Sequence, residues 1–176
     1  KSGRIQSVKV KTAEGDLWLG YVDPTYSFSS VCIELYPNGM LKFVEHLYGK
    51  VLFMGQSITI EGREGTEFYI SGAIKNFTTR DYLHLYQRGK SIKVSGQVIA
   101  SEQGRPITFI FNKNQIISLN GLKIKISSGK LVELWPHGEF KSFEVAEPSQ
   151  LLNHRGEKVS VPAGKKVFVD ELGYIL

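Results

Sequence analysis

The chain has 176 residues, a formal net charge of +5, and 18 glycines, ten phenylalanines and eight tyrosines. A single cysteine excludes an internal disulfide framework and a thiolate metal cluster. No apolar run approaches the roughly 20 residues that a membrane-spanning helix needs, and glycine-rich turns between aromatic and β-branched runs favour β structure.

The basic residues alternate with apolar ones, as in Val8–Lys11 and Lys123–Ile126. This pattern is typical of half-buried strands with one solvated face. A nucleic-acid-binding protein would gather its positive charge on one face, so the charge pattern argues against nucleic acid as a partner. Cys32 lies between Val31 and Ile33 and is predicted to be a small core residue rather than a nucleophile.

In chain order, Val8–Val10 and Asp16–Gly20 are interpreted as a diverged first unit of a repeat. Residues 33–44 then read Ile-Glu-Leu-Tyr-Pro-Asn-Gly-Met-Leu-Lys-Phe-Val, with Ile33 and Leu35 expected to face inward. Asn-Gly is a strong signal for a tight primed hairpin turn, and a proline ahead of it belongs at a strand end. We therefore expect a β-hairpin here.

The same sequence motif recurs at residues 66–77 and 132–143. A glutamate leads each copy, a glycine follows five residues later and a lysine three after that: Glu34, Gly39, Lys42; Glu67, Gly72, Lys75; and Glu133, Gly138, Lys141. The second glutamate lies 33 residues after the first, and the third lies 66 after the second. Such a period indicates a repeat architecture.

Further strands are predicted ahead of the later hairpins, at 58–60, 124–126 and 159–161, the last leading to 166–169 and a turn at Gly173. Ser91–Val94 opens another unit, whose hairpin at Thr108–Phe111 turns at 112–114 and follows a longer connection at 95–106. Residues 79–87 and 148–154 have some helical spacing, but strand or loop is favoured at 79–87. Ser95-Gly96 is expected to be a turn.

We therefore expect residues 1–176 to form a single all-β domain of antiparallel hairpin repeats of about 33–35 residues, extended or closed into a barrel-like or solenoid sheet. Positive φ angles are predicted at Gly39, Gly72, Gly138 and Gly173. The recurring apolar positions predict a buried core of Ile58, Ile60, Phe68, Ile92, Val94, Ile124, Ile126, Leu134, Val159, Val161 and Val169.

The motif at 34–42, together with residues 161–176, resembles MORN-like tandem hairpin repeats of the Y-x-N-G-x-L-K type found in bacterial envelope proteins. The resemblance covers most of residues 31–176 in degenerate copies. It implies β repeats and a location in the bacterial cell envelope or outside the cell. It carries no catalytic motif that transfers to this chain.

Catalytic, metal and cofactor sites are not predicted. The four histidines are not at metal-ligand spacing, and His137 is interpreted as a turn residue that tolerates positive φ. The repeated glutamates suggest the paired carboxylates of glycoside hydrolysis. The constant spacing of eight residues to a lysine instead favours ion pairs across each hairpin. Nucleophile-elbow and phosphate-loop motifs are absent.

Three aromatic residues, Tyr36, Tyr69 and Trp135, directly precede a tight turn in equivalent positions. In a stacked array of hairpins these three rings would form a row, an aromatic ladder. That ladder is either a second buried face of the sheet or an exposed platform for a sugar or peptide. The candidate binding residues are these three aromatics with Gln103 and Arg105, and the expected partner is a protein or a glycan. The sequence thus predicts a non-catalytic binding or structural module. The alternatives are a glycan-acting hydrolase with carboxylates at one rim and a basic nucleic-acid-binding β domain.

Overall fold

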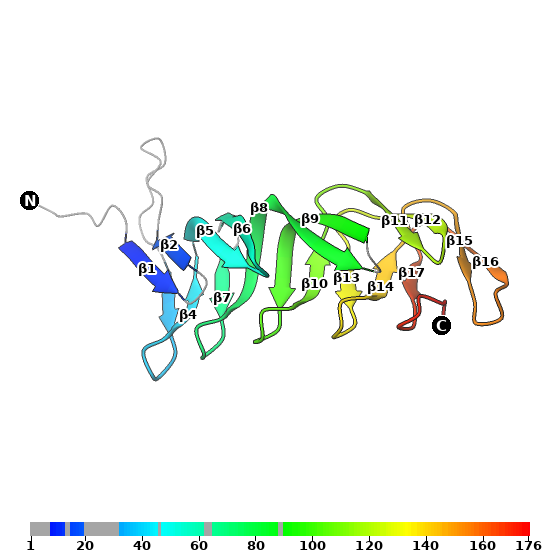
Figure 1. The fold of residues 1–176 in the computed structure, drawn as a ribbon. Helices are drawn as coiled ribbons and strands as arrows, with labels where there is room; N and C mark the ends of the chain where they lie inside the picture. The colour runs from blue at the N-terminus through cyan, green and yellow to red at the C-terminus, as the bar shows by residue number, and fades with distance from the viewer. Residues whose placement is uncertain (1–7, 13–14, 20–31, 46, 62–64, 88–89) are drawn as a thin grey trace, which may run out of the picture. The chain divides into compact units, whose positions relative to one another are not determined.

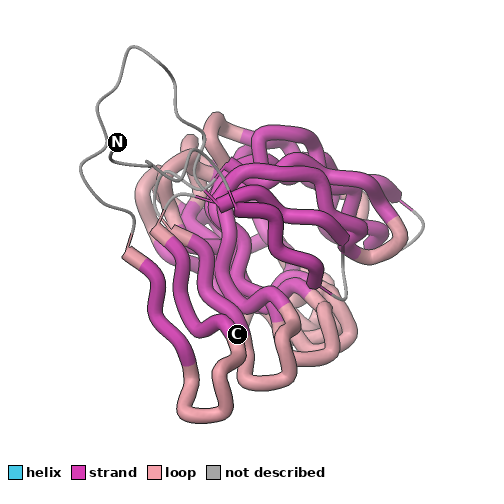
Figure 2. The backbone as a smooth tube through the Cα atoms, turned by 90° about the vertical axis from the view of Figure 1, so that its left-hand side faces the viewer, coloured by secondary structure: helices cyan, strands magenta, loops and turns pink. Residues whose placement is uncertain are grey.

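The computed structural model describes residues 8–12, 15–19, 32–45, 47–61, 65–87 and 90–176. All regular elements among these residues are β-strands (Figure 2). Every strand pair with a described register is antiparallel. The prediction of an all-β, hairpin-rich chain is therefore confirmed, including strand at residues 79–87. The chain divides into two compact units, residues 1–83 with 97–105 and residues 84–96 with 106–176.

Unit 1 contains two paths of hydrogen-bonded strands that meet at the long strand β8 (Figure 1). One path runs β1-β2-β5-β6-β8 and the other β3-β4-β7-β8. The strands are β1 (Val8–Thr12), β2 (Gly15–Leu19), β3 (Ile33–Leu35), β4 (Leu41–Val44), β5 (Leu47–Phe53), β6 (Gln56–Glu61), β7 (Thr66–Phe68) and β8 (Ile74–Gln87), which continues into the other unit. The rings of Phe53 and Phe77 pack edge to face with centroids 5.0 Å apart and join β5 to β8.

Unit 2 has one path of strands, β10-β13-β14-β17, and two separate hairpins, β11–β12 and β15–β16. Its strands are β10 (Pro106–Ile110), β11 (Gln115–Leu119), β12 (Leu122–Ile126), β13 (Leu131–Leu134), β14 (Phe140–Glu144), β15 (Ser149–Leu152), β16 (Lys158–Val161) and β17 (Lys166–Phe168). Strand β9 (Lys90–Ala100) is divided between the units. An isolated bridge between Ile126 and Val145 links the end of β12 to the segment after β14.

The predicted core is largely confirmed. Nine of the eleven predicted positions are buried, and Ile92 and Val159 are half-buried. The inward placement of Ile33 and Leu35 is wrong, because both side chains are exposed, and Cys32 is exposed as well. The physical reason is that β3 is an edge strand, which pairs only with β4 among the described residues.

The turn at Pro37–Gly39 shows why the glycine is needed. Gly39 N–H donates to Tyr36 O (2.8 Å) and Tyr36 N–H donates to Met40 O (2.8 Å), while Gly39 has a φ of 82°. The predicted positive φ is confirmed there and at Gly72, Gly138 and Gly173. The predicted primed turn is wrong, because proline fixes a negative φ at the first loop position. The loop is a type I turn closed by a left-handed glycine, the usual three-residue hairpin.

The same pair of backbone hydrogen bonds closes the loop between Ser101 and Arg105, where Gly104 has a φ of 73°. The expectation of a long connection at 95–106 is therefore wrong, since β9 continues through Gly96 to Ala100 and a tight hairpin follows. The assignment of a hairpin turn to 112–114 is also wrong. The strand that forms a hairpin with β10 is β9, which precedes β10 along the chain. Gly104, 32 residues after Gly72 and 34 before Gly138, was the sequence signal for this turn.

Primed turns do occur, at the ends of two other hairpins. The loop residues Met54-Gly55 have φ angles of 52° and 73°, and Asn120-Gly121 have 48° and 81°. A type I′ turn requires positive φ at both positions and favours Asn-Gly. Both residues have the positive φ, but asparagine tolerates this conformation and methionine adopts it at a conformational cost.

Replacing Met54 by asparagine is therefore expected to stabilise the protein by about 1 kcal/mol, because a left-handed conformation costs most side chains roughly that much and asparagine less. The measurement is urea denaturation of wild type and Met54→Asn. As a control, Met40→Asn changes an exposed methionine that lacks positive φ and should leave the midpoint nearly unchanged. A midpoint for Met54→Asn at or below that of wild type would contradict the assigned turn.

Candidate functional site

The three predicted aromatic residues are half-buried and each donates one side-chain hydrogen bond to a distant backbone carbonyl. Tyr36 Oη donates to Phe68 O (2.9 Å), and Tyr69 Oη donates to Ala100 O (2.9 Å). In unit 2, Trp135 Nε1 donates to Val169 O (3.1 Å). Each acceptor directly precedes the first residue of the next tight turn, namely Tyr69, Ser101 and Asp170. These side chains therefore connect one hairpin to the hairpin that lies beside it.

This geometry bears on the two interpretations of the aromatic ladder. The polar atom of each ring is used inside the fold, and part of each ring is covered, so the rings stabilise the packing of adjacent hairpins. Ser101 and Asp170 occupy the same turn position without an aromatic ring. Ser101 Oγ accepts from Arg105 N–H, and Asp170 Oδ1 accepts from the backbone N–H groups of Leu172 and Tyr174.

Replacing Tyr69 by phenylalanine is expected to lower the free energy of unfolding by about 1 kcal/mol. It removes one hydrogen bond and leaves a carbonyl in a buried region without that donor. The measurement is urea denaturation followed by circular dichroism. Tyr86→Phe is the matched control, since Tyr86 is among the most exposed tyrosines. Equal stability of Tyr69→Phe and Tyr86→Phe would show that the hydroxyl does not hold the hairpins together.

The predicted ion pairs across the hairpins are present. Lys42 lies 2.8 Å from Glu34, Lys75 lies 2.8 Å from Glu67, and Lys141 lies 3.7 Å from Glu133. In each hairpin the strand register shifts at a bulge, and the lysine is the extra residue opposite the shift. The bulge thus turns the lysine toward the glutamate eight residues earlier.

The charge pairs extend beyond single hairpins. Lys166 Nζ donates to Glu133 Oε1 at 3.0 Å, and this bond is the main reason that the pKa of Glu133 lies below its usual value. The hydrogen bond from Lys75 likewise lowers the pKa of Glu67, with a smaller contribution from the charge of Lys42. These glutamates remain ionised and paired at neutral pH, which is the opposite of the raised pKa that a general acid needs.

The remaining predicted residues, Gln103 and Arg105, are exposed in the loop that follows Ala100, whose carbonyl accepts the hydrogen bond from Tyr69. Trp135 lies in the other unit, where the Lys141 ammonium sits 5.3 Å from its ring centroid. In unit 1 the loops of the β3–β4 and β7–β8 hairpins are neighbours, because Met40 Cε lies 3.1 Å from the point that a Cβ on Gly72 would occupy.

Two exposed apolar side chains on these neighbouring loops, Met40 and Ile70, were not predicted as site residues. We define the turn surface as Met40, Ile70, Gln103 and Arg105, with Tyr36 and Tyr69 half-buried behind them. The signal in the sequence was an apolar residue in or next to the turn, where a polar residue is usual: Met40 directly follows Gly39, and Ile70 lies two residues before Gly72.

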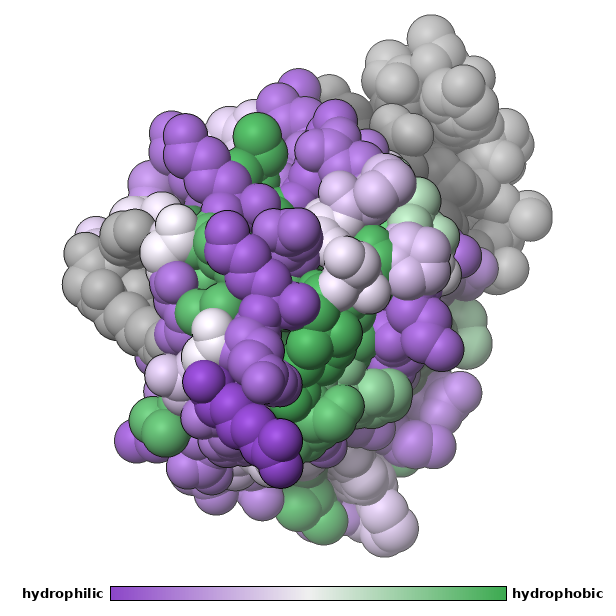
Figure 3. Space-filling view, turned by 90° about the vertical axis from the view of Figure 1, so that its right-hand side faces the viewer, coloured by the Kyte–Doolittle hydropathy of each residue, from purple (hydrophilic) through white to green (hydrophobic). Residues whose placement is uncertain are grey.

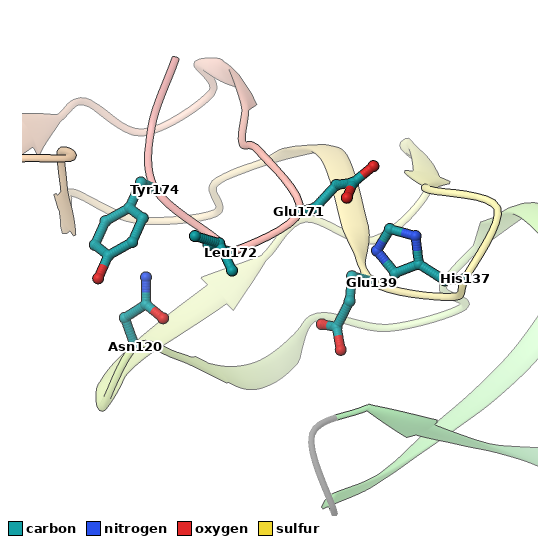
Figure 4. Close-up of a pocket in the computed structure, with 6 residues that line it drawn as sticks. All are labelled: Asn120, His137, Glu139, Glu171, Leu172 and Tyr174. Carbon is teal, nitrogen blue, oxygen red and sulfur yellow. The ribbon is translucent and has the colours of Figure 1, made fainter.

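Seen from the right-hand side of Figure 1, the surface shows hydrophobic areas between hydrophilic side chains (Figure 3). Unit 2 contains an open depression of about 540 Å³. Three hairpin loops line it with polar and apolar side chains: Asn120, His137, Glu139, Glu171, Leu172 and Tyr174 (Figure 4). The loops are tied together at its margin. Asn120 Nδ2 donates to Gly173 O (3.0 Å), His154 Nε2 lies 3.1 Å from Asp170 Oδ2, and the His154 ring packs on Tyr174. His137 is exposed in its turn, but the positive φ there belongs to Gly138.

The depression brings two carboxylates and an imidazole to one place, which suits a polar or cationic ligand. Across the described ranges, no three His, Cys, Asp or Glu side chains are grouped so that they could hold a metal ion. In the same part of the chain, no helix combines the length and the apolar character of a membrane span.

Comparisons of the chain with protein-family models, with curated proteins and with solved structures found no match. The functional interpretation therefore depends on the residues and contacts described above.

Proposed function

We propose that the chain is a non-catalytic binding or structural module of a bacterial envelope or secreted protein, built from MORN-like hairpin repeats of about 33–35 residues. The recurrent contacts support this proposal. The same two-bond turn, the same bulged lysine and the same aromatic donor occur in successive hairpins. The proposed array is an extended or solenoid-like sheet in which each hairpin packs on the next.

The observation that carries the functional proposal is the turn surface of unit 1. Repeats place equivalent residues in a row, and such rows form extended contact surfaces. Met40 and Ile70 are large, apolar and exposed on neighbouring loops. Gln103 and Arg105 are exposed polar residues on the next tight turn, which the hydrogen bond from Tyr69 to Ala100 O connects to the hairpin of Ile70. An apolar centre with a polar margin is the usual composition of a protein-binding site. We therefore favour a protein partner over a glycan.

The experiment is affinity capture from a detergent-solubilised bacterial envelope fraction, with three immobilised proteins compared by quantitative mass spectrometry. They are wild type, the double variant Met40→Ser/Ile70→Ser, and the control Ile107→Ser/Ile116→Ser, which removes exposed apolar residues in the other unit. The proposal predicts a protein retained by wild type and by the control but lost with the Met40/Ile70 variant. Identical retention by all three would contradict it.

One observation favours a second candidate, a glycan-acting hydrolase. Glu139 and Glu171 line the same depression beside His137, and paired carboxylates carry out glycoside hydrolysis when suitably separated. The test is turnover of soluble peptidoglycan fragments by wild type, Glu139→Gln and Glu171→Gln. Cleavage by wild type that both variants lose would establish the hydrolase and overturn the non-catalytic proposal.

A further inference from the structure

The outer edge of β3 carries backbone groups that no described strand pairs with. Cys32 O accepts a hydrogen bond from Glu45 N–H, and Tyr36 N–H donates to Met40 O, so these residues direct their backbone groups toward the return strand of their own hairpin. Backbone groups alternate in direction along an antiparallel strand. Ile33 and Leu35 therefore direct theirs away from β4.

The side chains of β3 are exposed where their counterparts are buried. Ile33 and Leu35 are 46% and 57% exposed, whereas the corresponding pairs are at most 5% exposed: Thr66 and Phe68 in β7, and Val132 and Leu134 in β13. The difference has a simple cause. Strand β7 receives β4 on its outer side, and β13 receives β10, but β3 has no such neighbour among the described residues.

The carbonyl of Leu35 completes the pattern. It directly precedes Tyr36, just as the carbonyls of Phe68, Ala100 and Val169 directly precede the first residue of their turns. Those three carbonyls each accept a hydrogen bond from Tyr36, Tyr69 or Trp135 of the hairpin on their outer side. Among the described residues, no side chain donates to the Leu35 carbonyl.

We propose that the β3 edge binds a hairpin of the same type from another polypeptide, by antiparallel strand addition. The structure defines its chemistry: a Tyr or Trp ahead of the turn to reach the Leu35 carbonyl, and a Lys-Phe-Val return strand to cover Ile33 and Leu35. The return strand β4 provides this pattern on β7. There the pKa of Lys42 is raised mainly by its hydrogen bond to Glu34, with a small contribution from the negative charge of Glu67. The hairpin of a second copy that turns at 170–173 does not fit the β3 edge. It has Asp170 at the position ahead of the turn where an aromatic residue is needed.

The probe is a fluorescein-labelled, end-blocked peptide of residues 33–45, which contains Tyr36 and the Lys-Phe-Val strand. Its binding to the whole chain is measured by fluorescence anisotropy. We expect saturable binding that weakens about fivefold when the tyrosine of the peptide is replaced by phenylalanine, because one neutral hydrogen bond is lost. A peptide of scrambled sequence is the control and should not bind.

Two variants of the protein test the edge itself. Ile33→Pro removes an outward N–H while a proline is tolerated on an edge strand, and it should weaken peptide binding by roughly tenfold. Leu35→Arg is a second variant, which places a charge on the contact face and should also weaken binding, with unchanged circular dichroism. Absence of saturable binding to wild type, or equal binding to wild type and both variants, would overturn the proposal.

The proposal rests on the repeat architecture proposed above but not on the turn surface. The Met40→Ser/Ile70→Ser variant should bind the peptide as wild type does, because neither residue lies in β3. Loss of peptide binding in that variant would assign the peptide to the turn surface and not to the edge, which would also overturn the proposal.

Discussion

Replacing Gly96 by alanine is expected to destabilise unit 2 by about 3–5 kcal/mol, through backbone strain together with overpacking. Gly96 has a φ of 116°, a conformation that residues with a side chain rarely adopt, although it lies inside strand β9. An added Cβ would lie 2.7 Å from Ile110 O and 2.6 Å from Asn112 Oδ1. The carbonyl belongs to the backbone of β10, so it cannot move aside without disturbing that strand.

Gly104→Ala is the matched control. Gly104 also has a positive φ, but a Cβ there would meet no atom within 4 Å, so only the conformational cost of about 1 kcal/mol remains. Thermal and urea unfolding of both variants gives the comparison. Equal destabilisation by the two substitutions would contradict the close approach of β10 to Gly96.

Replacing Phe77 by alanine is expected to cost about 3–5 kcal/mol, the usual range for truncating a buried phenylalanine. Phe77 is fully buried on β8, and its ring packs on Phe53. The loss is large because β8 is the strand at which both strand paths of unit 1 meet. Urea denaturation of Phe77→Ala, compared with Phe168→Ala at an exposed phenylalanine, measures it. A cost below about 1 kcal/mol for Phe77→Ala would place the core of unit 1 elsewhere.

Much of the fold was predictable because its signals are local. Turn glycines need positive φ, and Gly39, Gly72 and Gly138 follow their strands at constant spacing. The ion pairs were predictable from the glutamate–lysine spacing of eight residues, because both partners lie within one hairpin. By contrast, the exposure of Ile33 and Leu35 depends on whether another strand lies beside β3, and strand alternation contains no information about that neighbour.

The candidate site was less predictable than the fold. The position of Tyr36, Tyr69 and Trp135 ahead of each turn was evident, but their hydrogen bonds reach carbonyls 31 to 34 residues away. Only the packing of adjacent hairpins determines which carbonyl each ring meets. The third tight turn was missed because Ser101 replaces the aromatic residue there, although Gly104 keeps the spacing.

The central claim assigns stability to the aromatic rings and recognition to the turn surface. The measurement that tests it most directly is retention of the captured envelope protein by Tyr69→Phe and by Met40→Ser/Ile70→Ser, at a temperature at which both are folded. The account predicts that Tyr69→Phe retains the partner despite its lower unfolding midpoint, whereas the double variant loses the partner with its midpoint unchanged. The reverse pattern, with binding lost in Tyr69→Phe at unchanged stability and kept in the double variant, would contradict it.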